Sequence, residues 1–392
     1  MLRIESHFLR KRHFYWCRII LAQFCFFLIL SGSCIDRISI KIPDSYSSQL
    51  VVDGLITDEP GPYTINLSIA SPIEDFLKFR KKVTAKSVMI FDNEGNSELL
   101  EEVEKGIYQT KVGGIRGIVG RSYSVCIEMS DGKIYESIPD RMNPVGGIDS
   151  LYYTLDPFQP IDAPTQYSFV VYVDAKGIPE GENFSRFRYE GVFQVEANPE
   201  LYSEERIIDP GRGVECVLAV PGLDCVGLGL FDKPCTCCTC WVTQFEEKPM
   251  VISDRFIGKG AFRSIRVGSV PVEYWPFRVK YRMEVSQLSL SRIAYNYWNT
   301  VQSQKEAGSS LFQPPYGKAV TNIFEKNGSA IANGIFYASS VKKKQRYLSY
   351  NDINEFRLTP ERFNCYVNKE LIAASCLTVF KNSTNARPLD WK

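Results

Sequence analysis

Cysteine is the residue type whose spacing in this sequence points most directly to chemistry. Six of the twelve cysteines lie close together along the chain, at Cys216, Cys225, Cys235, Cys237, Cys238 and Cys240. The run CTCCTC suits either disulfides that close a long loop or a thiolate cluster for a soft metal such as copper or zinc. The N-terminus has the features of an export signal, described below, and exported proteins reach an oxidising compartment that favours disulfides. We therefore expect a disulfide-linked loop over 216–240 and no metal. The spacing leaves open which cysteines pair.

Three further cysteines stand apart from this loop. Cys365 and Cys376 are close enough in sequence to form a bridge of their own, which would close a short loop and hold the C-terminal end of the chain. The cysteines that follow Cys34 are odd in number, so at least one stays unpaired. Cys126 lies in the middle of an alternating strand pattern, and we expect it to be the free thiol.

The N-terminal residues carry the order of features found in an export signal. Five basic residues precede an apolar run, Ile19–Leu30, and Ser31-Gly32-Ser33-Cys34 follows it directly. The run falls short of the roughly 20 apolar residues that a membrane-spanning helix needs. Leu30–Cys34 resembles the lipobox of bacterial lipoproteins, in which lipid is attached to the cysteine. We therefore expect residues 1–33 to be a lipoprotein signal peptide. We expect Cys34 to carry acyl chains, palmitate among them, which attach the protein to a membrane.

Loss of that segment would remove both histidines, His7 and His13. Ser-His-Asp and Cys-His catalysis and the commonest zinc sites would then be excluded. The segment also holds five of the 46 basic residues and one of the 45 acidic residues, so the remaining chain would have a net charge near −3. This charge argues against nucleic acid as a partner.

Carboxylates are then the main candidates for acid and base chemistry. Asp53, Asp58 and Glu59, or Glu246 and Glu247, could supply the acid and base of a glycosidase-type site. Nothing in their spacing selects one pair above the others. We therefore expect no catalytic residues and no cofactor.

Two other kinds of motif have simpler structural explanations. The glycine-rich stretch 113–120 has the look of a phosphate-binding loop, but an alternating strand rather than a helix follows it, which indicates a turn. The basic runs 78–82 and 342–346 could contact lipid headgroups. Runs of this length are more often solvated loops or charged guards on edge strands, and we expect that here.

Strands are the elements that must position these residues. Apolar and polar residues alternate over 63–69 and again over 122–128, which is the pattern of a strand with one buried face. Asp131-Gly132 predicts a hairpin turn, and short loop-forming stretches separate further strands. We predict a mainly β fold with a signal peptide at 1–33, a tether at 34–48, an immunoglobulin-like β-sandwich at 49–145 and a larger β-rich domain at 146–392 that holds the 216–240 loop.

The larger domain combines long strand-like runs with one clear helix. The strand-like runs are 167–173, 184–195, 251–257 and 277–285. From about 289 to 307 apolar residues recur at helical spacing, and Gly308 follows as a plausible C-cap. Tyr295, Tyr297 and Trp298 could stack on a ligand, but the favoured interpretation is that they pack the helix on a sheet.

Several stretches of the sequence resemble one known family. They are VVDGLITDEPGPYTINLS near the start, YRMEVSQLSLSRIAYNYWNTVQSQKEAGSSLFQPP in the middle, Gly334–Ala338, and an ending with Cys365, Cys376 and Arg387–Trp391. The family is the Bacteroidota lipoprotein family known as domain of unknown function 4249, and the resemblance covers nearly the whole chain after Cys34. It implies a lipid-anchored protein of the cell envelope, often found beside outer-membrane receptors and transporters, and it supplies no catalytic residues.

Three functions from different classes remain open on these observations. The first is a non-catalytic binding or accessory module of an outer-membrane, uptake-type complex, anchored at the outer membrane on its periplasmic or surface face, with an outer-membrane receptor or transporter as partner. The second is a carboxylate-based hydrolase of envelope or glycan substrates. The third is a cysteine-based metal-handling protein. The first fits a β-rich body without histidine most directly.

Overall fold

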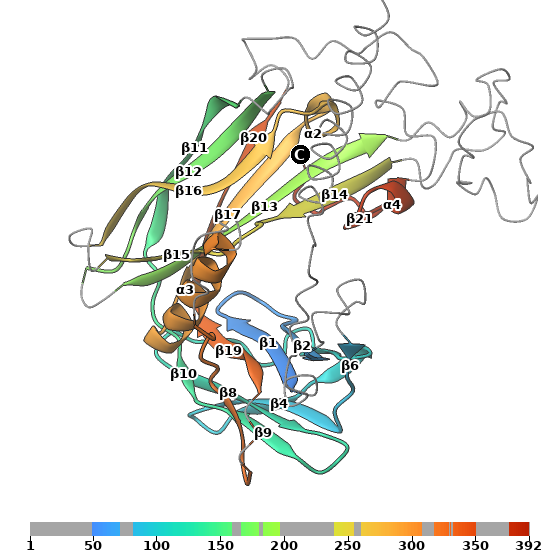
Figure 1. Ribbon diagram of the computed structural model, residues 1–392, viewed down its shortest axis with the longest axis vertical. Coiled ribbons are helices and arrows are strands. Elements are labelled where there is room, and N and C mark those ends of the chain that lie inside the picture. Colours follow the sequence, from blue (N-terminus) through green and yellow to red (C-terminus); the bar gives the residue numbers. More distant parts are fainter. Residues whose placement is uncertain are drawn as a thin grey trace, which may run out of the picture. The chain divides into compact units, whose positions relative to one another are not determined.

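The computed structural model describes most of the chain after residue 48. The described residues are 49–70, 81–158, 166–179, 183–196, 239–254, 260–307, 317–328, 330, 332–349 and 376–391. They fall within one compact unit. Strands dominate them, which confirms the predicted mainly β fold (Figure 1).

Two sheets built mostly from the first hundred described residues face each other. The first runs in the order β19-β1-β2-β7-β6, with β3 on β2, and the second in the order β18-β9-β8-β4-β5, with β10 on β8. Their strands are β1 (Leu50–Thr57), β2 (Thr64–Ile69), β3 (Lys81–Lys82), β4 (Ser87–Asp92), β5 (Ser97–Leu99), β6 (Glu101–Glu104), β7 (Ile107–Gln109), β8 (Ser122–Glu128), β9 (Ile134–Ser137), β10 (Asp140–Arg141), β18 (Ile323–Glu325) and β19 (Asn333–Ser339). Val52 and Ile65 of one sheet and Ile90 and Val125 of the other share one core. We call this pair of sheets the first sandwich.

The alternating sequence patterns explain how these strands bury one face. In β8, Tyr123, Val125 and Ile127 are buried, while the residues between them, Cys126 included, are only partly buried. Apolar side chains at every second position leave water on the same side, which fixes the register of the sheet. The hairpin from β8 to β9 turns at Gly132, whose positive φ of 86° suits the glycine predicted there. Cys126 is a free thiol, as predicted.

The parallel strand β19 comes from a segment late in the chain. It pairs with β1 from Val51 opposite Asn333 to Thr57 opposite Ser339, and β18 pairs with β9. At Gly334 a Cβ atom would lie 1.8 Å from the carbonyl oxygen of Val52, so only glycine fits. The residues 323–339 therefore complete sheets whose other strands lie in the 49–145 range, and the division of the chain at 145 and 146 stays a prediction.

Two further sheets form the second sandwich. One has the order β11-β12-β16, and the other β20-β17-β13-β14-β21 with β15 on β13. Their strands are β11 (Gly147–Phe158), β12 (Gln166–Lys176), β13 (Phe184–Glu196), β14 (Thr239–Phe245), β15 (Met250–Ser253), β16 (Ala261–Pro271), β17 (Tyr281–Ser289), β20 (Val341–Leu348) and β21 (Ser383–Thr384). Phe169 and Val171 from the first of these sheets pack with Phe187, Tyr281 and Val285 from the second.

Within the described ranges, three helices accompany the strands: α2 (Tyr274–Arg278), α3 (Arg292–Ala307) and α4 (Cys376–Val379). The helix predicted at about 289–307 is confirmed as α3. Tyr295, Tyr297 and Trp298 pack against a cluster that includes Phe184 of β13 and Ile335 of β19, so they supply packing between the two sandwiches. Among the described helices, none has the length and apolar content needed to cross a membrane.

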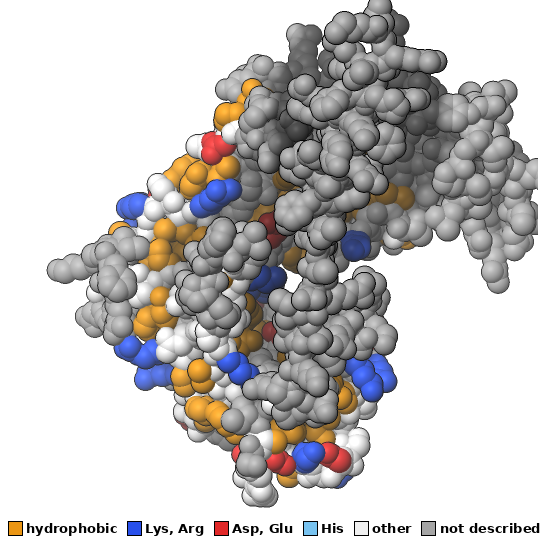
Figure 2. All heavy atoms as spheres, in the orientation of Figure 1, with side chains coloured by type: hydrophobic (Ala, Val, Ile, Leu, Met, Phe, Trp, Pro, Cys, Tyr) orange, Lys and Arg blue, Asp and Glu red, His pale blue; other side chains and the backbone are white. Residues whose placement is uncertain are grey.

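The basic run at 342–346 forms most of β20, an edge strand of the second sandwich, as predicted for a charged guard. The Nζ atom of Lys344 donates to the carbonyl oxygen of Asp149, and Arg346 lies over the ring of Tyr153 at 4.6 Å from its centroid. On the face shown in Figure 2, acidic and basic side chains are scattered among hydrophobic and polar ones.

The predicted Cys365–Cys376 disulfide is wrong, because Cys376 is bonded to Cys240. Their Cα atoms lie 6.0 Å apart although 136 positions separate them in the sequence. The reason is tertiary: β21 pairs with Trp241 and Val242 of β14, which brings the end of the chain beside the start of that strand. The lipidation candidate Cys34 and the remaining disulfide candidates lie outside the described residues; these are Cys216, Cys225, Cys235, Cys237, Cys238 and Cys365.

Three chain crossings between the sandwiches meet at a cluster of hydrogen-bonded serines. The Oγ atom of Ser289 donates to the carbonyl oxygen of Asn143 at 2.6 Å and accepts from the N–H of Ser340 at 3.0 Å. The Oγ atom of Ser339 donates to the carbonyl oxygen of Ser289 at 2.7 Å. Asp58, which caps the crossing from β19 to β20, accepts from the N–H of Val341 at 2.9 Å. Because the three serines are buried, these bonds offset the cost of removing their polar groups from water.

Asp140 is buried at the same junction, with 1% of its surface exposed. Its carboxylate accepts hydrogen bonds from the Oγ atom of Ser291, at the start of α3, and from the N–H of Ala338 in β19. Burial raises the pKa of this carboxyl group from its ordinary 3.8 to about 6, because the two hydrogen bonds only partly compensate the lost hydration of the charge. The folded protein therefore holds a proton on Asp140 at a pH where the unfolded chain has lost it.

We expect Asp140→Asn to remove one component of the pH dependence of stability. The folded pKa lies above the unfolded value, so this carboxyl group lowers the free energy of unfolding as the pH rises from about 4 to about 6, by roughly 3 kcal/mol in total. Urea unfolding of both proteins at several pH values measures this. The wild type should lose about that much stability relative to the variant across the window. A constant difference between the two proteins would show that Asp140 does not titrate in this range.

Candidate functional site

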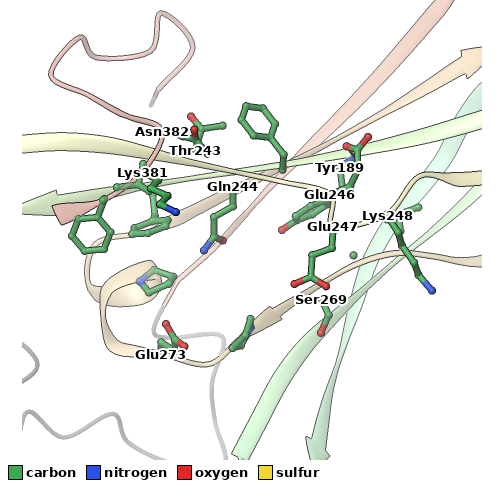
Figure 3. A pocket seen from close by; sticks show the side chains of 18 of the residues that line it. Tyr189, Thr243, Gln244, Glu246, Glu247, Lys248, Ser269, Glu273, Lys381 and Asn382 are labelled. Carbon is green, nitrogen blue, oxygen red and sulfur yellow. Dashed lines mark hydrogen bonds between the residues drawn. The ribbon is translucent and has the colours of Figure 1, made fainter. Parts of the chain in front are cut away.

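A groove of about 990 Å³ opens beside β14 and β16 in the second sandwich. Strand β16 is an edge strand of its sheet, and β21 covers only the first part of β14. Helix α2 and residues Phe380–Asn382 after α4 supply the remaining walls, together with the turn from β14 to β15 (Figure 3). The groove thus lies where strands of both sheets of the second sandwich border open space. We call it the β14–β16 groove.

The interior of the β14–β16 groove is apolar and its rim is polar. Phe193, Val242 and Val267 are buried and form its inner surface. The rim carries exposed polar and charged side chains, at Glu247, Lys248, Ser269, Glu273 and Lys381. Binding sites for small ligands commonly have this composition, since apolar surface supplies affinity and a few polar groups fix orientation.

A chain of buried hydrogen bonds fixes the side chain of Gln244 in the groove. The hydroxyl of Tyr189 donates to the oxygen of Tyr281 at 2.9 Å, and the hydroxyl of Tyr281 donates to Oε1 of Gln244 at 2.9 Å. Burial raises the pKa of both tyrosines, so both hydroxyl groups keep their protons. The amide oxygen is therefore occupied, and the Nε2 group of Gln244, which has no partner among the described residues, is left as a donor to the groove (Figure 3).

Glu246 follows Gln244 by two residues but is held in a structural ion pair. Its Oε1 atom lies 2.8 Å from Nη2 of Arg186 and 3.6 Å from Nε of Arg188, and its Oε2 atom accepts from the N–H of Tyr189 at 3.2 Å. The side chains of Arg186 and Glu246 are 9% and 11% exposed. Both carboxylate oxygens are thus engaged, and Glu246 is a poor choice for an acid or base.

Arg186 carries the same network into the first sandwich. Its Nη1 atom donates to the hydroxyl of Tyr337 in β19 at 3.1 Å. Its guanidinium carbon lies 3.7 Å from the ring centroid of Trp298 in α3, which is a close cation–π contact. One buried cation therefore links β13, β19, α3 and the turn after β14.

Of the carboxylates named from the sequence, Glu59 and Glu246 line one smaller pocket of about 150 Å³, and both are held in ion pairs. Asp58 accepts hydrogen bonds from Ser340 and Val341, and Glu59 pairs with Lys343 at 2.7 Å. Asp53 is exposed on β1, and Glu246 is paired as described above. Of the acids named, only Glu247 lies on the rim of the groove without a structural ion pair in the described part of the chain.

Sequence reasoning missed the groove residues Gln244, Glu273 and Lys381. They come from a strand, the start of a short helix and the segment after α4, and their positions along the chain give no shared pattern. The metal alternative rests mainly on cysteines before Cys240, which lie outside the described residues. Within the described ranges, no three His, Cys, Asp or Glu side chains are grouped in a way that could hold a metal ion.

We expect Glu246→Gln to lower the free energy of unfolding by about 3–5 kcal/mol, because the variant leaves the buried charge of Arg186 without its partner. Glu306→Gln is the matched control. It breaks the Lys248–Glu306 pair, whose side chains are 50% and 44% exposed, and should cost less than about 1 kcal/mol. Urea unfolding of both variants gives the comparison. Equal losses in the two variants would contradict the role assigned to Arg186 and Glu246.

One known protein family matches most of this chain. A family model described as a domain of unknown function (DUF4249) matches residues 35–345. The matched residues include the first sandwich, helix α3 and the groove residues on β14 and β16, whereas Phe380–Asn382 lie beyond them. No curated protein matches the chain.

Proposed function

We propose, on the premise that this chain belongs to the family of domain of unknown function 4249, that it is a lipid-anchored protein of the cell envelope that binds a ligand without transforming it. The anchor is a lipid on Cys34, added after removal of residues 1–33. The β-rich body extends from the outer membrane and serves an uptake-type complex there. Its partner in that complex is an outer-membrane receptor or transporter.

The observation that carries the binding role is the fixed donor inside the β14–β16 groove. Tyr281 occupies the amide oxygen of Gln244, so the Nε2 group is oriented before any ligand arrives. A group that is already oriented loses little entropy on binding, which favours recognition. Of the two acids nearest to it along the chain, Glu246 is engaged on both oxygens, and this supports binding over acid and base catalysis.

The lipid anchor is tested by Cys34→Ser. A serine hydroxyl does not take the diacylglycerol that the cysteine thiol takes, so we expect the variant to leave the membrane fraction and to lose incorporation of labelled palmitate. Cys126→Ser is the matched control, since it replaces a free thiol on a strand of the first sandwich, and it should stay with the membrane. A Cys34→Ser protein that remains in washed membranes and keeps the label would refute the anchor.

The partner is tested by purification of the lipidated protein from its own membrane in mild detergent. We expect an integral outer-membrane receptor or transporter to co-purify in comparable amount, and mass spectrometry identifies it. An unrelated lipoprotein purified in the same way sets the background. If the chain elutes alone, or with the same proteins as that control, the accessory role is excluded.

A further inference from the structure

We propose that the β14–β16 groove binds a neutral glycan chain. This inference rests on the proposed binding function and names the class of its ligand.

The charges in the groove balance. Glu246 is paired with Arg186, and Lys248 is paired with Glu306 at 3.1 Å. The charged side chains of the lining that remain are two acids and two bases, which are Glu247, Glu273, Arg266 and Lys381. A groove without excess charge gives no electrostatic advantage to a polyanion such as a nucleic acid or to a strongly basic peptide, so it favours a ligand without net charge.

The polar groups of the groove match hydroxyl groups. Nε2 of Gln244 offers hydrogen-bond donors, and the carboxylates of Glu247 and Glu273 offer acceptors. The hydroxyl of Ser269 on β16 does both. Figure 3 shows Gln244 and Glu247 extending into the same open space, with Ser269 beside it. A sugar hydroxyl both donates and accepts, so a row of them can satisfy this mixture of groups.

Aromatic side chains supply the apolar part of the surface. Trp275 of α2 and Phe380 after α4 both line the groove and meet edge to face, with ring centroids 6.4 Å apart. Phe193 of β13 lies deeper. A sugar ring has an apolar C–H face as well as hydroxyl edges, and aromatic rings offer such a face a large and rigid contact area. The same ligand class thus explains both halves of the lining.

The strand edges beside the groove argue against a peptide that adds as a further strand. Strand β16 is irregular, with register shifts opposite Val171–Tyr172 and Val173–Ala175, a positive φ of 50° at Ser264 and a proline at its end. On β14, the N–H of Thr243 already donates to the carbonyl oxygen of Asn382 at 3.0 Å. Added strands need a regular row of open backbone groups, so recognition here rests on side chains.

The test is titration calorimetry of the folded chain with maltohexaose, cellohexaose, xylohexaose and mannohexaose, beside an oligogalacturonate as an acidic glycan and an uncharged extended peptide. We expect at least one neutral oligosaccharide to bind and the acidic glycan to bind more weakly. Gln244→Leu should weaken that binding by about 3- to 10-fold, the effect of one lost hydrogen bond to an uncharged group. Gln345→Leu, the same change on exposed β20, should leave the affinity unchanged.

Glu273→Gln and Lys381→Met test the same groove through exposed rim residues, where folding is not at risk, and each should alter affinity for the bound oligosaccharide. The proposal is overturned if none of the neutral oligosaccharides binds. It is also overturned if the substitutions of Gln244, Glu273 and Lys381 all leave the affinity for the bound oligosaccharide unchanged. Binding of the peptide instead would refute the ligand class and leave the binding function standing. The anchored, accessory role is refuted separately, if Cys34→Ser stays in the membrane or if the lipidated protein purifies without a receptor or transporter.

Discussion

The buried cation of Arg186 is the constraint on which most of this structure depends. A guanidinium group with 9% of its side chain exposed needs partners that replace water, and it finds them in Glu246, Tyr337 and Trp298. These partners belong to the turn after β14, to β19 and to α3. Because the one guanidinium group contacts all three elements, it fixes the first sandwich, the helix and the groove wall relative to one another. The hydrogen bonds continue from Glu246 to the N–H of Tyr189, and from the hydroxyl of Tyr189 through that of Tyr281 to Gln244.

The sequence predicts well those features that depend on neighbours along the chain. Alternation over 122–128 identified β8, with Tyr123, Val125 and Ile127 buried, and helical spacing identified α3. The free thiol at Cys126 followed from the same alternation. In each case a local period records which face meets the core, and that information lies within a single element.

Features that join distant elements leave no such period. Cys376 pairs with Cys240 across 136 positions because β21 adds to β14, and proximity in sequence favoured the wrong partner, Cys365. The sequence offers Glu246 as a candidate acid or base because its ion-pair partner, Arg186, lies 60 positions away. The groove was invisible for the same reason, since Gln244, Glu273 and Lys381 meet only after two sheets and two short helices have packed. Long-range pairing is a property of the whole fold, and only the structure displays it.

The parallel pairing of β19 with β1 has a consequence for how the chain can be made. Ribosomes release β1 hundreds of residues before β19, yet Val51–Thr57 find their parallel neighbour only in Asn333–Ser339. Until then one edge of the sheet offers unpaired backbone groups to any passing strand, which is the usual route to misassembly of nascent β proteins. The first sandwich is therefore finished only after most strands of the second, β11 to β17, have been synthesised. A chain that stops before β19 would therefore lose its C-terminal part and also leave the first sandwich, which is made first, without one of its strands.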